Sequence, residues 1–173
     1  MKGGGYVLMS VKFKIKVNKF PEMQAKIKDL NGKTINVGLT GENAWLGGIH
    51  EYGCKIRITP KMRAWLHNNG LHVKESTQYI TIPERSFLRG GFDNCKDEVA
   101  NKAAMVVPLV LNGEMNEDTA INLIGTLFRD RIKDYTVSLN SPPNHPFTIE
   151  HKNSSNPLVD TGDLVNSISY EVE

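Results

Sequence analysis

The stretch "NEDTAINLIGTLFRDRIKDY", Asn116 to Tyr135, decides the fold because it predicts a long amphipathic helix. Asn116 can cap this helix, and two acidic residues follow at its positively polarised end. The spacing of three and four between apolar residues places them on one helical face. They are Ala120, Ile124, Leu127, Phe128, Ile132 and Tyr135. One face of the helix must therefore pack against another element.

A second long helix is predicted immediately before the first. From Phe92 onward, small or apolar residues again recur every three or four positions: Cys95, Val99, Ala103, Val106 and Val110. Pro108 is expected to kink or end this helix, because proline lacks the backbone N–H that an interior position needs. Asn112 and Gly113 then break the chain, so the two helices are predicted to be neighbours.

Short segments with alternating apolar and polar residues predict strands around these helices. They are "VKFKIKV" (11–17), "KTINVGL" (33–39), "KIRITP" (55–60), "QYITIP" (78–83), "FTIEH" (147–151) and "ISYEV" (168–172). Shorter helices are expected from Pro21, over 41–53, over 61–70, and after a cap at Asp160 or Thr161. The predicted fold is α+β: a small, mainly antiparallel sheet of short strands packed against two longer helices, with an extended loop or arm.

The expected helix over 41–53 includes "GGIHEYG" and has a specific predicted orientation. Ala44, Trp45, Ile49 and Tyr52 are expected to face inward, with Gly53 as the C-cap. His50 and Glu51 resemble part of a metalloprotease helix, but the position one turn later holds a cysteine instead of a second histidine. We interpret His50 as a structural or surface residue.

Length and composition indicate one domain. The chain has 173 residues, 39% hydrophobic and 23% charged, with a net charge of +2. We assign 10–173 to a single α+β domain and 1–9 to a disordered leader. The codons for Lys2-Gly3-Gly4 can form a ribosome-binding site, so translation is expected to begin near Val7 or Met9. No apolar run approaches the roughly 20 residues that cross a bilayer, and the two cysteines lack a CxxC spacing, which favours buried thiols in a reducing cytosol.

One catalytic hypothesis remains open from the residues alone. If "FTIEHK" is a strand, Glu150 and Lys152 share a face, and Asp134 lies upstream. Two carboxylates that hold Mg²⁺ and a lysine that stabilises developing charge form the skeleton of a metal-dependent nuclease. Such pairs are common on exposed strands, so the motif is weakly specific.

Charge is distributed unevenly along the chain. Through residue 40 there are eight lysines and two acids, whereas from residue 150 there are one lysine and five acids. The bland interpretation is a set of solvated faces. The sharper one is head-to-tail assembly, in which the basic surface of one subunit meets the acidic surface of the next and closes a ring.

Five motifs in order resemble the tail-completion, or virion-morphogenesis, family of tailed bacteriophages. The motifs are "GGIHEYG" (47–53), "IPERSFLRGGF" (82–92), "LIGTLFRDRIKDYT" (123–136), the "PP" at 142–143 and "NPLVDTGDLVNSISYEV" (156–172). Ser86 departs from the pattern, because relatives often carry a second proline there. The resemblance covers about 44–172.

This resemblance implies a non-catalytic neck protein without a cofactor, commonly a hexameric ring. Such a ring caps the tail tube or seals its junction with the head-side connector, and DNA passes through its lumen without specific recognition. The implied location is the virion, after assembly in the cytoplasm of the bacterial host, with no membrane contact.

The resemblance also implies roles for individual residues. Arg85 and Arg89 would pair with acids across a subunit interface, and Phe87, Leu88 and Phe92 would anchor the turn into the core or a neighbour. The stretch Asp160-Thr161-Gly162-Asp163 would cap the last helix and pin the final strand. The loop 138–157, which contains Pro142 and Pro143, would be an arm that reaches a neighbouring subunit or the tail tube.

Overall fold

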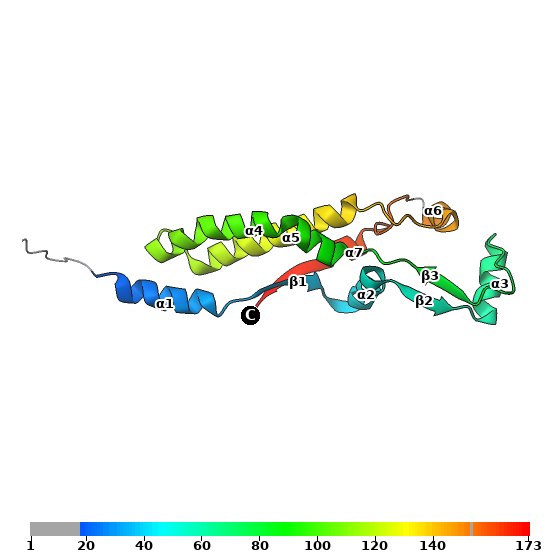
Figure 1. The fold of residues 1–173 in the computed structure, drawn as a ribbon, viewed down its shortest axis with the longest axis horizontal. Helices are drawn as coiled ribbons and strands as arrows, with labels where there is room; N and C mark the ends of the chain where they lie inside the picture. The colour runs from blue at the N-terminus through cyan, green and yellow to red at the C-terminus, as the bar shows by residue number, and fades with distance from the viewer. Residues whose placement is uncertain (1–17, 153) are drawn as a thin grey trace, which may run out of the picture.

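Two long helices, α4 (Phe87–Asn112) and α5 (Glu117–Ser138), lie side by side along the molecule in the computed structural model (Figure 1). The turn between them uses Gly113 at a φ of 78°, and the Asn116 side chain accepts a hydrogen bond of 2.8 Å from the Asp118 amide. Both predicted helices and the Asn116 cap are therefore confirmed.

The α4 helix differs from its prediction at both ends. It begins at Phe87, five residues before the predicted start, and it continues through Pro108 to Asn112. Of the two outcomes expected at Pro108, a kink or the end of the helix, the second is wrong, whereas the predicted break at Asn112 and Gly113 is confirmed. Val106 and Val110, on either side of the proline, are buried against Ala120 of α5, and this packing holds the last turn in place.

The structure describes residues 18–152 and 154–173. The leader assigned to 1–9 and the strand predicted over 11–17 lie outside the described residues. No helix within the described ranges is long and apolar enough to span a membrane.

The strands form two antiparallel pairs. Strand β1 (Ile35–Leu39) pairs with β4 (Ile168–Val172), so that Leu39 lies opposite Ile168. Strand β2 (Cys54–Arg57) pairs with β3 (Tyr79–Ile82), with Cys54 opposite Ile82. The α+β class with short antiparallel strands is confirmed, and the strands divide between two small sheets.

Five shorter helices complete the described fold. They are α1 (Phe20–Asn31), α2 (Ala44–Tyr52), α3 (Pro60–Asn68), α6 (Pro146–Lys152) and α7 (Asp163–Asn166), and a 3₁₀ turn, η1 (Gly41–Asn43), precedes α2. The strand predicted for "FTIEH" is wrong, because this segment is α6. Pro146 stands at the first helical position, where its fixed φ suits a helix and its missing N–H costs nothing.

The α2 helix is rotated relative to its prediction. Trp45 and Tyr52, expected inside, are both 68% exposed, whereas Glu51 is only 3% exposed. Gly47, one turn before Glu51, is also buried, and a Cβ there would overlap the side chain of Leu39. The helix therefore approaches its neighbours through a glycine and an acid. The predicted C-cap at Gly53 is confirmed, with a φ of 69°.

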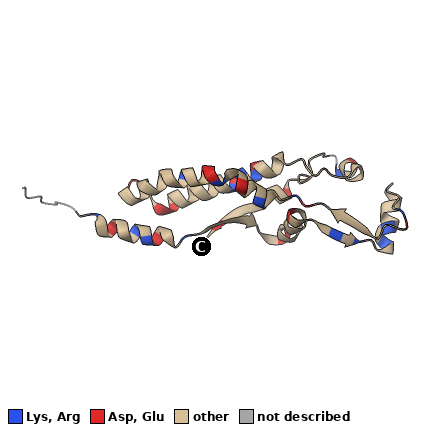
Figure 2. Ribbon diagram, in the orientation of Figure 1, with Lys and Arg blue, Asp and Glu red and all other residues tan. Residues whose placement is uncertain are grey.

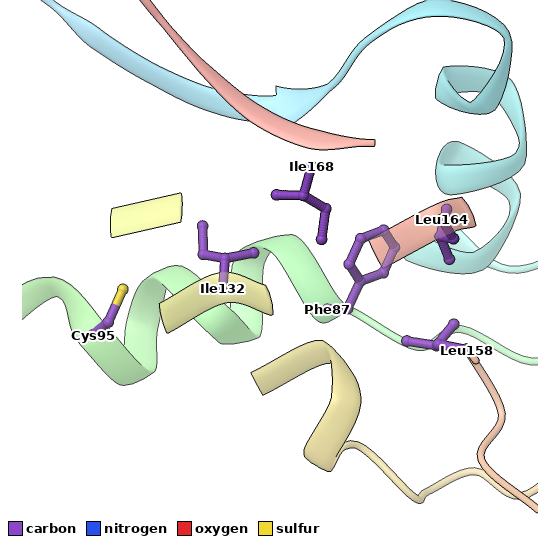
Figure 3. Packing of buried hydrophobic residues seen from close by; sticks show 6 residues of the cluster. All are labelled: Phe87, Cys95, Ile132, Leu158, Leu164 and Ile168. Atoms are coloured by element: carbon purple, nitrogen blue, oxygen red, sulfur yellow. The ribbon is translucent and has the colours of Figure 1, made fainter. Parts of the chain in front are cut away.

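The main core lies where α4 begins (Figure 3). Phe87 has no exposed surface and packs among residues from α5, α7 and β4. Its buried neighbours are Cys95, Ile132, Leu158, Leu164 and Ile168. Burial raises the pKa of the Cys95 thiol. Cys54 is only partly buried, so the prediction of two buried thiols holds for Cys95 alone.

The segment from Cys54 to Ile82 forms an arm that we call the basic arm. It contains β2, α3 and β3 and lies at the end of the molecule opposite to α1 (Figure 1). Arg63 of α3 stabilises the return loop by donating hydrogen bonds of 2.7 to 3.0 Å to the carbonyls of Val73, Lys74 and Thr77. The arm has one buried hydrophobic residue, Leu66.

Candidate functional site

Glu51 links two of the motifs that are distant in the sequence. Its carboxylate accepts hydrogen bonds from the backbone N–H groups of Leu88 (2.8 Å) and Arg89 (3.1 Å) and from the Ser86 hydroxyl (3.2 Å). The first N–H groups of a helix have no partner within it. Ser86, at the N-cap of α4, makes no side-chain cap. Glu51 therefore caps α4 from a different helix.

Arg89 completes this junction on its solvent side. Its Nε donates to the Glu51 carboxylate at 2.9 Å, and its Nη2 donates to the Glu51 backbone carbonyl and to Glu84. The guanidinium also lies over the Tyr52 ring, 4.8 Å from its centre. The hydrogen bonds to Glu51 and Glu84 raise the pKa of Arg89. Both of its acidic partners belong to its own chain.

Arg85 is buried and faces the opposite way. It is 3% exposed, and its Nε donates to the Pro142 carbonyl at 2.8 Å. Its Nη2 donates to the Pro143 carbonyl at 3.2 Å and to the Asn144 side-chain oxygen at 3.0 Å. These partners are neutral oxygens of the same chain and none of them is an acid, so the pairing of Arg85 with an acid across a subunit interface stays a prediction. Burial lowers the pKa of this guanidinium.

The contacts of Arg85 change the interpretation of the loop 138–157. Instead of a free arm, its first part is held against the start of α4, and its second part forms α6. Pro142 and Pro143 remain exposed on their outer sides, so they stay predicted contact residues. The segment that extends at this end of the molecule is the basic arm, which packs on α6 through Trp65 and Phe147, with ring centres 6.4 Å apart.

We expect Arg85→Met to release this loop. The variant removes three hydrogen bonds from a charged donor and should lower the free energy of unfolding by about 2–3 kcal/mol. Hydrogen exchange should accelerate at the Thr148 and Ile149 amides, which donate hydrogen bonds to the His145 carbonyl at the end of this loop. Arg57→Met is the matched control, because Arg57 is exposed, and its effect should stay within about 0.5 kcal/mol. Unchanged exchange at Thr148 and Ile149 would contradict this role of Arg85.

The other predicted interface residues differ in their surroundings. Phe87 lies in the core and is not on the surface, whereas Phe92 is 48% exposed and its ring centre is 5.7 Å from that of Phe128. Asp160 and Asp163 are exposed, and Asp163 accepts a hydrogen bond of 2.7 Å from the Thr161 hydroxyl. The predicted cap of the last helix at Asp160 or Thr161 is wrong.

Gly162 is the N-cap of α7, with a φ of 91°. Glycine enters this left-handed conformation without the steric cost that other residues bear. Asp163 is then the first helical residue, where its charge suits the positive end of the helix.

The three residues of the nuclease hypothesis have different partners in the structure. Glu150 and Lys152 are on α6, and residues two apart on a helix do not share a face. Lys152 donates to the carbonyls of Asn156 and Val159, and Asp134 accepts a long hydrogen bond of 3.3 Å from Arg131. In the described part of the chain, no group of three or more potential ligands could hold a metal ion.

Sequence reasoning missed the role of Glu51. It considered this residue only as the neighbour of His50 in an incomplete metal motif. A usable signal is the spacing of Gly47 and Glu51, one helical turn apart, since a glycine permits the close approach that buries the acid.

Comparisons with protein-family models, with curated proteins and with solved structures found no match to this chain.

Proposed function

We propose that this chain is a non-catalytic ring subunit of the neck of a tailed bacteriophage, where tail and head join. Its partners are copies of itself, commonly six in such rings, together with the tail tube or the head-side connector. DNA passes through the ring without specific recognition. The protein is then a virion component that assembles in the cytoplasm of the bacterial host.

The observation that carries this proposal is the amount of apolar surface left uncovered. Among the described residues, eleven hydrophobic residues are buried, and eleven large hydrophobic residues are exposed. The exposed set is Phe20, Ile27, Trp45, Tyr52, Trp65, Tyr79, Phe92, Met105, Leu123, Val137 and Val172. Single exposed hydrophobic residues are normal, but here the exposed set is as numerous as the buried one and six of its members are aromatic residues, a class that is enriched at protein interfaces. Contacts with other subunits would cover them.

The basic arm supports the same proposal. Residues 54–82 contain five lysines and arginines and one acid, Glu75, a net charge of +4. Figure 2 shows the basic positions on β2 and α3, at one end of the molecule. Trp65 and Tyr79 are exposed on the same arm. An arm with positive charge and aromatic rings suits the acidic surface of a neighbouring subunit, and its charge also suits DNA phosphates in a lumen.

The motifs of the family resemblance also meet in space. "GGIHEYG" supplies Glu51, and "IPERSFLRGGF" supplies the helix start that Glu51 caps. Leu158, Leu164 and Ile168 of the last motif pack around Phe87. Motifs that are separated in the sequence therefore form one junction. This arrangement favours a shared structural role over a set of unrelated short matches.

Gene deletion and electron microscopy test the proposal. In cells that carry this gene in its native phage or prophage, deletion should yield separate heads and tails, or tails of abnormal length. Expression of the intact chain from a plasmid should restore joined particles, and cryo-electron microscopy should locate the chain as a ring at the neck. Normal particles from the deletion strain would contradict the proposal.

The nuclease hypothesis receives no support from the arrangement of its residues, and it is tested separately. The purified chain with Mg²⁺ and supercoiled plasmid should leave the plasmid intact, as should Glu150→Ala. Nicking by the parent protein that disappears in Glu150→Ala would instead favour the nuclease over the neck subunit.

A further inference from the structure

A cavity of about 320 Å³ lies behind the Arg85 junction. It is lined by residues of α2, the loop after α5, α6, and the segment that leads into α7. The residues used below are His50, Asn144, Lys152, Leu158, Asp160 and Asp163. Its volume is at the lower end of the range of small-ligand sites. None of the predicted catalytic groups except Lys152 contacts it.

Asn144 lines this cavity and has an unpaired donor. Its side-chain oxygen accepts from Arg85, and a guanidinium can only donate, so the amide cannot be turned around. The Asn144 Nδ2 atom is therefore fixed as the other end of the amide. It is buried and has no hydrogen-bond partner among the described residues. A buried donor without an acceptor is costly, so the site is suited to an incoming acceptor.

His50, which also lines the cavity, has a second unpaired atom. Its Nδ1 is buried and has no partner in the described parts of the chain. Burial lowers the pKa of His50, and the positive charges of Arg85 and Lys152 lower it further. No acid opposes these effects at His50. The imidazole is therefore neutral at neutral pH.

Lys152 adds a charged donor. Its Nζ donates to the carbonyls of Asn156 (2.7 Å) and Val159 (2.9 Å), and an ammonium group has a third N–H. Burial lowers the pKa of Lys152, while Asp160 acts in the opposite direction. Asp160 forms no ion pair within 4.0 Å with it in the described structure. The lysine is therefore able to bind a further anionic group.

The rest of the lining indicates the size and charge of that group. Asp160 and Asp163 also border the cavity and are exposed, so a doubly charged anion such as phosphate is disfavoured by repulsion. Leu158 and Leu164 supply an apolar wall against which short methylene groups can pack. A single negative charge on a short aliphatic group satisfies both conditions.

We propose that this cavity binds one carboxylate group, which accepts hydrogen bonds from Asn144 Nδ2 and Lys152 Nζ. The carboxylate comes either from a free small acid or from the side chain of an acidic residue on another protein. Because the second source is a protein contact, it would place the cavity at an assembly interface. The inference itself rests on the cavity and does not depend on the neck assignment.

The test is a titration of the ¹⁵N-labelled full chain with sodium acetate, at constant ionic strength maintained with sodium chloride. Saturable shifts are expected at the Asn144 side-chain amide and the His50 imidazole. Asn144→Asp keeps the oxygen that faces Arg85 and replaces the unpaired donor with an acceptor, and it should weaken acetate binding at least tenfold. Lys152→Met should do the same.

Asn36→Asp is the matched control. Asn36 is exposed on β1, away from the cavity, so the variant adds the same charge without changing the site, and acetate binding should stay unchanged. A thermal melt of each variant shows whether it is folded. If Asn144→Asp or Lys152→Met fails to fold, the remaining variant and the titration of the parent protein still show whether the cavity binds acetate.

One further probe distinguishes the source of the carboxylate, and a second, inorganic phosphate, tests the charge of the ligand. N-acetyl-glutamate amide, whose one carboxylate is on the side chain, should bind more tightly than acetate if the natural ligand is an acidic side chain. Equal or weaker binding assigns the site to a free small acid. Tighter binding of inorganic phosphate, or acetate shifts that do not saturate or that persist in Asn144→Asp, would overturn the proposal and leave a water-filled cavity.

Discussion

Glu51→Ala should lower the free energy of unfolding by about 2–4 kcal/mol. The substitution removes the acceptor for the Leu88 and Arg89 amides at the start of α4 and for the Ser86 hydroxyl. Buried donors left without a partner cost more than the net value of the bonds they lose. Loss of the negative charge from the positive end of a long helix adds to this. Urea denaturation monitored by circular dichroism measures the effect.

Glu84→Ala is the matched control for this prediction. Glu84 bonds the same arginine, Arg89, but its side chain is 56% exposed and it contacts no helix amide. An exposed ion pair contributes little, so the loss should be below about 1 kcal/mol. Equal losses from the two substitutions would show that the Arg89 ion pair, and not the cap of α4, accounts for the effect of Glu51.

Phe87→Ala should lower the free energy of unfolding by about 3–5 kcal/mol, the usual range for deletion of a fully buried phenylalanine ring. Phe87 has no exposed surface and packs among residues from three other parts of the chain (Figure 3). The cavity left behind would lie between α7, β4 and the helix hairpin. Denaturation in urea should show a lower midpoint with little change in slope.

Phe92→Ala provides the control on the same helix. Phe92 is about half exposed and packs on one side only, against Phe128. Its truncation should cost less than about 1.5 kcal/mol. If both variants unfolded at the same urea concentration, the main core would not be centred on Phe87.

The elements that sequence predicted well are those with long or regular periodicity. The stripe from Ala120 to Tyr135 spans several helical turns, so its three-and-four spacing cannot be mistaken for a strand. "KTINVGL" and "ISYEV" alternate cleanly and form β1 and β4. In contrast, "FTIEH" is short enough to fit either period, and Pro146 decided in favour of a helix.

The candidate site was harder to predict because its contacts are tertiary. The spacing of Gly47 and Glu51 hints at a close approach, but it does not identify the hydrogen-bond donors of Glu51, which are more than thirty residues away in the sequence. The sequence favours pairing of Arg85 with acidic side chains, but within the chain its partners are the carbonyls of a proline-rich loop that follows α5. A hydrophobic pattern likewise could not reveal that Trp45 and Tyr52 face outward on α2.

The pairing of β1 with β4 determines when, during synthesis, the chain can complete its fold. β1 precedes the helix hairpin and β4 follows it. The two paired strands are therefore separated by most of the described sequence. Contacts of this kind form late, because a long loop must close before they return any free energy. The α4–α5 hairpin, with its four-residue turn, can fold while synthesis continues. The core around Phe87 cannot form until Leu164 and Ile168 have emerged from the ribosome, because both residues belong to it. An unfinished polypeptide therefore lacks the packed core that a finished one has, and in the ring that we propose this delay would keep truncated copies from being incorporated.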